Sequence, residues 1–354
     1  MPEKIKLTIN GKRCEGEKGQ TILEVANAYD IWIPTLCYDP RLIPFGACRL
    51  CLVSVEGARA LLPACTAEIT PDMKVTTSNE RIESIRKTII ELLLSDHPAD
   101  CMTCESTGAC TLQELAYKYG VKETPYKGDT HSYHLMDANP VIERDQDKCV
   151  LCGRCIRICE EVTGPGVYGF VGRGFDGIAT TPYEHELEDT PCLFCGQCIS
   201  TCPVGALSSK LSRGLGRPWE FEKTDTVCPY CGVGCTLTLW VKDNEVENVT
   251  APLDAGVNRG NLCVKGRFGF GYISSPDRLK QPLIRDRKGV LKKATWAEAL
   301  ALVAKKLKAI EKKDGPDSIG GLASARCTNE ENYLFQKFMR SVIGTNNVDH
   351  CARL

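Results

Sequence analysis

Cysteine is the residue type whose spacing points most clearly to chemistry in this chain. The 354 residues include 22 cysteines, and most of these fall into short groups with two or three residues between neighbours. In a reducing compartment thiols stay free, so closely spaced cysteines indicate metal binding rather than disulfides. Thiolates are soft ligands that suit iron–sulfur clusters or zinc, and the spacing within each group must distinguish the two.

Two copies of one cysteine run, C-x2-C-x2-C-x3-C, give the most specific signal. The copies are Cys149, Cys152, Cys155 and Cys159, and then Cys192, Cys195, Cys198 and Cys202. In bacterial two-cluster ferredoxins with this spacing, the fourth cysteine of each run binds the other cluster. We therefore predict one [4Fe–4S] cluster on Cys149, Cys152, Cys155 and Cys202, and a second on Cys159, Cys192, Cys195 and Cys198. The alternative is a pair of zinc sites, which usually consist of two CxxC pairs separated by a dozen or more residues.

Two other groups precede this repeat. Four cysteines spaced C-x10-C-x2-C-x13-C follow a predicted hairpin and helix, as in a [2Fe–2S] ferredoxin, although the spacing departs from the plant type and zinc remains an alternative. In the next group three cysteines leave one position of a [4Fe–4S] cluster open, and a nearby histidine could fill it or could be an exposed residue at a helix end. The two groups are Cys37, Cys48, Cys51 and Cys65, and His97, Cys101, Cys104 and Cys110.

The last group is spaced C-x2-C-x3-C-x27-C and predicts one more [4Fe–4S] cluster. Its members are Cys228, Cys231, Cys235 and Cys263. The glycines of CPYCGVGC allow backbone amides to approach sulfur closely. Five clusters, one [2Fe–2S] and four [4Fe–4S], then account for 19 of the 22 cysteines and one histidine. Of the remainder, Cys14 lies in a predicted strand and is expected to be a small buried hydrophobe.

The elements that must position these groups can be predicted from the pattern. Residues 1–80 form a small α/β unit, in which Asn10-Gly11 predicts a type I′ hairpin, and Thr21 with Glu24 predicts a helix capping box. Residues 81–120 are helical, interrupted at 97–110 by the second group. The Gly-rich segment between the two ferredoxin-type runs predicts a loop or hairpin.

The pattern of polar and apolar residues changes after the Cys228–Cys263 group. Short strands surround it, and from residue 295 the pattern becomes amphipathic helix, buried strand IGGLASA, a helix that Thr328 and Glu331 begin and Gly344 ends, and a further strand in NNVDHCARL. This is the opening of an open α/β domain. One strand–helix–strand unit cannot cover both faces of a parallel sheet, so we expect the printed chain to end inside a domain.

Charge and hydropathy exclude several other classes of function. The net charge is −1, so there is no basic field for a nucleic acid. No stretch approaches the roughly 20 apolar residues of a membrane span, and the first residues contain no apolar signal segment. We therefore predict a soluble, cytoplasmic protein with no membrane span.

The order of the groups from 37 to 202 resembles the N-terminal half of iron-only hydrogenases and of the large iron–sulfur subunit of respiratory NADH dehydrogenase. The segments CPYCGVGC, NLCVKGRFGF and ARCTNEENYLFQKFMRSVIGTNNVDHCARL resemble the catalytic (alpha) subunit of NAD(P)- or hydrogenase-linked molybdenum/tungsten formate dehydrogenases. The hydrogenase motifs expected after residue 210 are absent from the sequence. Respiratory subunits usually lack two complete ferredoxin runs.

The resemblance implies an α+β multidomain chain. The expected domains are a β-grasp [2Fe–2S] ferredoxin domain (1–80), a helical His/Cys3 cluster segment (81–120), a bacterial-type two-[4Fe–4S] ferredoxin domain (140–212), a small β-rich [4Fe–4S] domain (221–280) and an incomplete α/β molybdopterin domain (281–354). It also implies that a selenocysteine, the metal ligand, follows Leu354 directly, so that no catalytic residue lies within the printed sequence.

By the same resemblance, His97 is a cluster ligand, and a molybdenum or tungsten bis-pterin guanine dinucleotide binds in the full-length enzyme. The residues that this resemblance places near the pterin or its metal are Lys265, Arg326, Asn329, Asn332, Asn346, Asn347, His350 and Cys351. From spacing alone Lys265 could equally be a solvated lysine.

The implied activity is interconversion of formate and CO2. Two electrons would pass along the clusters to a partner, either a flavin/NAD(P)-binding iron–sulfur subunit or a hydrogenase subunit in a hetero-oligomer. A lone formate site would need one cluster, so four more imply a distant acceptor. The alternatives are a stand-alone, non-catalytic electron-transfer subunit and a zinc-bound interaction protein.

Overall fold

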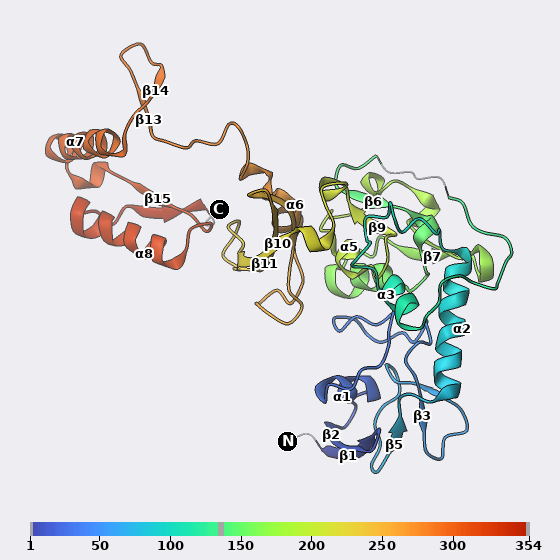
Figure 1. Ribbon diagram of the computed structural model, residues 1–354. Helices are drawn as coiled ribbons and strands as arrows, with labels where there is room; N and C mark the ends of the chain where they lie inside the picture. The colour runs from blue at the N-terminus through green and yellow to red at the C-terminus, as the bar shows by residue number, and fades with distance from the viewer. Residues whose placement is uncertain (1–2, 134–137, 352–354) are drawn as a thin grey trace. The chain divides into compact units, whose positions relative to one another are not determined.

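The computed structural model describes residues 3–133 and 138–351 (Figure 1). The chain divides between residues 222 and 223 into two compact units, called unit 1 and unit 2 below. The units are described separately. The α-helices are α1 (Ile22–Ala28), α2 (Glu80–Asp96), α3 (Thr111–Lys118), α4 (Arg154–Arg157), α5 (Gln197–Thr201), α6 (Val264–Phe268), α7 (Trp296–Asp314) and α8 (Asn329–Phe338).

The strands are short and belong to several small sheets. They are β1 (Lys4–Ile9), β2 (Lys12–Glu17), β3 (Leu52–Val55), β4 (Leu62–Pro63), β5 (Lys74–Thr76), β6 (Ile142–Arg144), β7 (Gly169–Val171), β8 (Ile178–Thr180), β9 (Leu207–Ser209), β10 (Glu222–Val227), β11 (Thr236–Lys242), β12 (Glu245–Thr250), β13 (Leu283–Arg285), β14 (Leu291–Lys293), β15 (Gly321–Ala323) and β16 (Val348–His350).

The first sheet has the strand order β2-β1-β5-β3-β4 and packs against α1. The predicted hairpin is confirmed, because Asn10 and Gly11 both have positive φ, 51° and 79°, between the antiparallel strands β1 and β2. The predicted capping box of Thr21 and Glu24 is also confirmed. Cys14 is 4% exposed in the core beneath this sheet, as expected for a small hydrophobe.

A second core in unit 1 lies between α2, α3 and residues 140–212, which are called the ferredoxin-like region below. It contains fully buried residues such as Leu50, Ile90 and Leu112. The same core includes cysteines from three predicted cluster groups, namely Cys37 and Cys48, Cys110, and Cys149, Cys152 and Cys202. Three groups that are separate in sequence therefore border one apolar core.

The two ferredoxin-type runs adopt the same backbone conformation. In the first, Leu151 and Gly153 have φ of 50° and 68°, and in the second, Phe194 and Gly196 have φ of 49° and 69°. Each glycine then leads into a short helix, α4 or α5. The left-handed conformation suits glycine because it has no Cβ. The predicted hairpin between the runs is the antiparallel pair β7–β8.

Unit 2 has the three-stranded sheet β10-β11-β12, the hairpin β13–β14 and the parallel pair β15–β16 with α7 and α8. The predicted helices are confirmed, and Gly344 ends the second one at φ 83°. The prediction that IGGLASA forms a buried strand is confirmed only in part: Ile319 and Gly321 are buried, whereas Leu322 of β15 is 82% exposed. The sheet here is small, because β15 pairs only with β16 among the described residues. One face of such a two-stranded sheet stays open to solvent.

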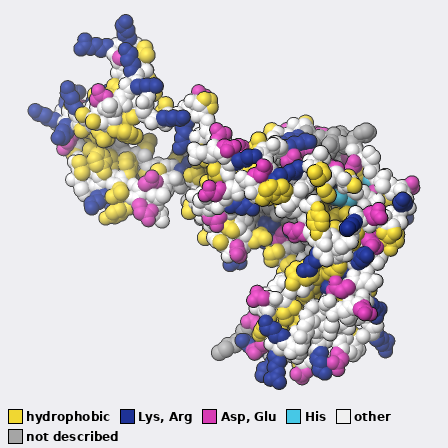
Figure 2. Space-filling view, in the orientation of Figure 1, with side chains coloured by type: hydrophobic (Ala, Val, Ile, Leu, Met, Phe, Trp, Pro, Cys, Tyr) yellow, Lys and Arg dark blue, Asp and Glu magenta, His cyan; other side chains and the backbone are white. Residues whose placement is uncertain are grey.

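Apolar side chains lie open on this second unit. Trp296, Leu300 and Val303 of α7 are each more than half exposed, as are Tyr333 and Leu334 of α8. Figure 2 shows hydrophobic side chains gathered over these helices, with Lys and Arg around them. Elsewhere, no helix in the described parts of the chain is both long and apolar enough to cross a membrane.

Candidate metal centres

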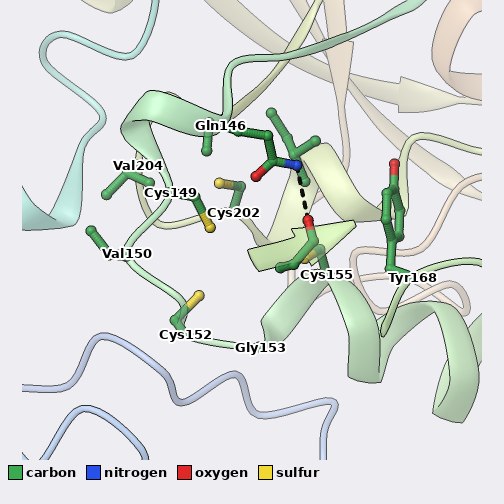
Figure 3. A pocket seen from close by; sticks show the side chains of 12 residues that line it. Gln146, Cys149, Val150, Cys152, Gly153, Cys155, Tyr168, Cys202 and Val204 are labelled. Atoms are coloured by element: carbon green, nitrogen blue, oxygen red, sulfur yellow. Dashed lines mark hydrogen bonds between the residues drawn. The ribbon is translucent and has the colours of Figure 1, made fainter. Parts of the chain in front are cut away.

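Four thiols of the ferredoxin-like region line one hollow. They are Cys149, Cys152, Cys155 and Cys202, so three residues of the first run meet the fourth cysteine of the second. Figure 3 shows these side chains around the hollow. Burial raises the pKa of Cys152 to about 12 and the pKa of Cys149 and Cys202 to about 11. Without a positive centre these thiols keep their protons, and iron would bind them as thiolates.

The complementary set lines a second hollow. It consists of Cys159, Cys192, Cys195 and Cys198. The backbone N–H of Val167 donates to Cys159 Sγ at 3.3 Å, and that of Phe194 donates to Cys192 Sγ at 3.4 Å. Thiols line the walls of both hollows. Among the described residues, no group of three or more His, Cys, Asp or Glu side chains is arranged to hold a single metal ion. Four thiol donors around each hollow have the chemistry that an iron–sulfur cluster needs.

The first group lies in the loop between α1 and β3, with its last member, Cys65, just after β4. Cys51 Sγ lies 3.3 Å from Cys65 Sγ, and the backbone N–H of Cys48 donates to Cys37 Sγ at 3.5 Å. The neighbouring Cys48 thiol and backbone N–H groups lower the pKa of Cys37 to about 5, against the effect of its burial. The four thiols are buried or half-buried, which fits four ligands of one small cluster.

A buried ionic network joins this loop to the ferredoxin-like region. Asp39, which is 1% exposed, accepts hydrogen bonds from Arg41 at 2.7 Å, from Arg154 at 3.0 Å and from Thr201 at 2.8 Å. Burial alone would raise the pKa of Asp39, but the hydrogen bonds from Arg41 and Thr201 outweigh it and hold the pKa below its usual range. Arg157 donates to the carbonyl oxygen of Cys37 at 2.7 Å. The network therefore fixes the loop that carries Cys37.

A second arginine holds the other side of the same group. Arg86 of α2 is 2% exposed and donates to the carbonyl oxygens of Leu50 and Leu52, each at 3.0 Å. These two carbonyls flank Cys51. A buried guanidinium normally needs such partners, and Glu83 adds a carboxylate at 3.1 Å. Arg86 thus positions the backbone of a predicted ligand.

His97 follows the last residue of α2 and has a buried, unpartnered nitrogen. Its Nδ1 has no hydrogen-bond partner among the described residues. Burial lowers the pKa of His97, with Asp100 opposing the effect, so the neutral imidazole is favoured. Neutral imidazole is the form that binds metals. Cys104 and Cys110 are buried while Cys101 is exposed, and the orphaned nitrogen fits the missing fourth ligand.

The last group lies beside β11 and α6 in unit 2. The N–H of Cys228 donates to the carbonyl oxygen of Cys235 at 2.8 Å, and Cys228 is buried, whereas Cys231 and Cys263 are exposed. Asn258 supports the loop before Cys263: its side chain accepts from Thr236 N at 2.8 Å and donates to the carbonyl oxygen of Asn261 at 2.9 Å.

The residues predicted near a pterin fall into two places in unit 2. Lys265 is on α6, directly after Cys263 and Val264. Most of the others lie near the carboxyl ends of the parallel strands β15 and β16 or at the start of α8, which is where open α/β sheets bind ligands. Cys351 Sγ lies 3.7 Å from Ser324 Oγ, and hydrogen bonds from the Ala325 backbone and from Ser324 lower the pKa of Cys351.

The predicted pterin residues differ in their local contacts. Arg326 lies 5.9 Å from the ring centre of Tyr230, which follows Cys228 by two residues. Asn332 donates to the carbonyl oxygen of Ser324 at 3.2 Å, and Asn347 to that of Asp317 at 2.9 Å. These two amides therefore hold backbone. Asn329 is the first residue of α8, Asn346 precedes β16 and His350 is its last residue.

Sequence reasoning missed the residues that support the thiols. Asp39 and Arg86 carry no metal-ligand spacing, and most of their partners are far away in the sequence. The available signal was weak: a charged residue within three positions of a cysteine, as with Asp39 and Arg154, in a segment otherwise rich in Gly and Pro.

Five domain families match successive parts of the chain. Residues 2–80 match the 2Fe-2S iron-sulfur cluster binding domain, 86–125 the NADH-ubiquinone oxidoreductase-G iron-sulfur binding region, and 139–208 the ferredoxin-like domain of NADH-quinone oxidoreductase subunit 3. Residues 221–275 match the molybdopterin oxidoreductase Fe4S4 domain, and 278–354 match molybdopterin oxidoreductase. The chain combines NADH-quinone oxidoreductase G-like iron–sulfur domains with molybdopterin oxidoreductase domains.

Several curated proteins align along almost the whole length of this chain. The NADPH-Fe(3+) oxidoreductase subunit alpha of Geobacter sulfurreducens is 41% identical over 350 residues, which cover 99% of this chain and 40% of the relative. A G-type subunit of NADH-quinone oxidoreductase from Rhizobium meliloti is 43% identical over 351 residues, with coverage of 99% and 40%. The chain thus spans about 40% of the length of these curated relatives.

A formate dehydrogenase name occurs at lower identity. A Staphylococcus aureus protein, named provisionally as a formate dehydrogenase, is 31% identical over 392 residues, which cover all of this chain and 39% of the relative. A chain of an NAD+-reducing [NiFe]-hydrogenase superposes with a TM-score of 0.56 at 29% identity, covering 60% of this chain and 90% of that one. These names describe oxidoreductases and their subunits. For this chain, the activity, the partner subunits and the formate assignment stay predictions.

Proposed function

We propose that this chain is the iron–sulfur relay of a formate dehydrogenase or CO2 reductase catalytic subunit, carrying two electrons between a molybdenum or tungsten bis-pterin site and a partner subunit. The observation that carries the relay is the sorting of eight thiols into two four-thiol hollows. The formate assignment rests on the sequence resemblance of residues 226–354 and on the relatives at 31% identity. The expected partner is a flavin/NAD(P)-binding or hydrogenase subunit, in the cytoplasm.

The cluster ligands are part of the same proposal. One [2Fe–2S] cluster would use Cys37, Cys48, Cys51 and Cys65, and four [4Fe–4S] clusters would use the other sixteen predicted ligands. The pterin metal would supply the two-electron chemistry when bound. The chain's own residues would hold the thiolates, bury them and exclude water around them, while Lys265 and the β15–β16 end would face the pterin.

A second function is favoured by a specific observation. The relatives at 41% and 43% identity are named as NADPH-Fe(3+) and NADH-quinone oxidoreductase subunits. In that case the chain would relay electrons from NAD(P)H, with no formate chemistry. A stand-alone electron-transfer subunit without a pterin is the third possibility.

Metal content and reduction by substrate separate these functions. We expect the anaerobically purified native complex to contain about 18 iron atoms per copy of this chain, from one [2Fe–2S] and four [4Fe–4S] clusters, with matching acid-labile sulfide. Zinc in place of iron would contradict the relay. Molybdenum or tungsten together with formate-dependent cluster reduction, followed by electron paramagnetic resonance (EPR), supports formate chemistry. Reduction by NAD(P)H in a preparation that formate leaves oxidised supports the second function.

A further inference from the structure

The segment between the two cysteine runs inserts a tyrosine into the wall between the two hollows. Tyr168 is 7% exposed and lines both of them. Figure 3 shows its ring at the edge of the first hollow, on the side of Cys155. No motif predicted a role for this residue, and the clusters themselves need only the cysteines.

The polar end of Tyr168 makes its contact in the second hollow. Its hydroxyl donates to Cys198 Sγ at 3.9 Å, in a fully buried position. Thr163 adds a hydroxyl 3.9 Å from Cys195 Sγ of the same set. In the first hollow, the amide of Gln146 donates instead to the carbonyl oxygen of Ala179, at 2.8 Å. The side-chain environments of the two thiol sets therefore differ, although their backbones repeat.

Hydrogen bonds to cluster sulfur shift the reduction potential. Reduction adds negative charge to the cluster and its thiolates, and a donor near sulfur stabilises that charge. A buried donor acts strongly because little water screens it. A tyrosine hydroxyl on Cys198 should therefore make the second cluster easier to reduce than the same cluster without it.

We propose that Tyr168 is a positioning residue shared by the two [4Fe–4S] clusters. The hydroxyl of Tyr168 raises the reduction potential of the second cluster, which is bound by Cys159, Cys192, Cys195 and Cys198. The ring of Tyr168 fills the wall between the two clusters. The inference rests on the proposed cluster ligands. It assigns the two halves of the repeat different potentials through one side chain.

The test compares Tyr168→Phe with Tyr183→Phe in the anaerobically purified protein with its bound clusters. Tyr183 is in the same region but 92% exposed, so it controls for loss of a hydroxyl. In a redox titration monitored by EPR, Tyr168→Phe should move the midpoint of one [4Fe–4S] component to a more negative potential. Tyr183→Phe should leave all midpoints unchanged, and iron and sulfide content should match the wild type in both variants.

The outcomes separate this inference from the proposed function. Full cluster content with unchanged midpoints in Tyr168→Phe overturns the role of Tyr168 and leaves the relay intact. A wild-type protein without iron–sulfur clusters overturns both. A second test does not depend on the midpoint potentials. With ring-deuterated tyrosine incorporated, pulsed EPR should detect deuterium next to both ferredoxin-type clusters, and a deuterium signal that is the same in Tyr168→Phe contradicts the placement.

Discussion

The thiols of the ferredoxin-like region and those of the Cys228–Cys263 group differ in how far the fold encloses them. In the first region every thiol is buried or half-buried in one of two hollows. In the second group Cys231 and Cys263 are exposed, and Cys228 alone is buried. The ferredoxin-like region has the donors for two cubanes, and the Cys228–Cys263 group has the donors for one. The difference shows that donor spacing and enclosure are separate properties.

The same contrast extends to the two units. Unit 1 has two apolar cores and the buried network around Asp39, whereas unit 2 has small cores and an α7 without a single buried residue. Unit 1 can therefore be expected to hold its cluster sites through its own packing. Unit 2 presents apolar side chains that further protein could cover, consistent with relatives more than twice as long as this chain.

The largest effect is expected at Asp39. Replacing it in Asp39→Asn leaves Arg41 and Arg154 without their buried charge partner, which typically costs ~3–5 kcal/mol. We expect a loss of this size in the free energy of unfolding, measured by anaerobic urea denaturation and circular dichroism. Glu56→Gln is the matched control, because its pair with Lys74 is exposed and worth at most ~1 kcal/mol. Equal effects of the two variants would remove the distinction between buried and surface pairs.

A pair of core substitutions compares the helices of the two units. Ile90→Ala in α2 removes a fully buried side chain and should destabilise the protein by ~2–5 kcal/mol, whereas Leu300→Ala in α7, where the side chain is 61% exposed, should stay within ~0.5 kcal/mol. Urea denaturation of each variant gives both values. A large loss for Leu300→Ala in the native complex would sharpen the comparison, because it would mean that other protein covers α7 there.

Cluster removal tests enclosure directly. Under an iron chelator, iron should leave the Cys228–Cys263 group at least about tenfold faster than the ferredoxin-like pair, a barrier difference of ~1.4 kcal/mol or more, because Cys231 and Cys263 are accessible. Absorbance of the iron–chelator complex follows the release. The fast phase should shrink by about four iron atoms in Cys231→Ser. Release of all the iron in a single phase would contradict the difference in enclosure.

The smallest effect concerns helix caps that both units share. Thr21→Ala and Thr295→Ala each remove a side chain that accepts from the backbone of the third helical residue, in complete capping boxes. Loss of such a cap typically costs about 1 kcal/mol, within a range of about 0.5–2 kcal/mol. Thr21 is 9% exposed, so its loss should lie at the upper end of the range, near ~2 kcal/mol. Thermal unfolding of the two variants measures the difference, and a larger effect at Thr295 would reverse the expected order.

Local sequence determined much of this protein. The Asn10-Gly11 hairpin, the capping boxes of Thr21 and Thr328, the helix end at Gly344 and the burial of Cys14 follow from rules that span a few residues. The crossed pairing of the ferredoxin-type thiols was predicted as well, since the repeat itself encodes it. The ligand assignments stay predictions until metal is measured.

Tertiary structure decided which residues support those thiols. Asp39 meets Thr201 across 162 positions, Arg86 holds the carbonyls beside Cys51, and Tyr168 stands between two hollows. These contacts depend on how separate segments pack, so no spacing rule along the chain contains them. The exposure of Leu322 on β15 also depends on tertiary packing. An apolar strand is buried only if another layer of the protein covers it, and the residue pattern of the strand cannot supply that layer.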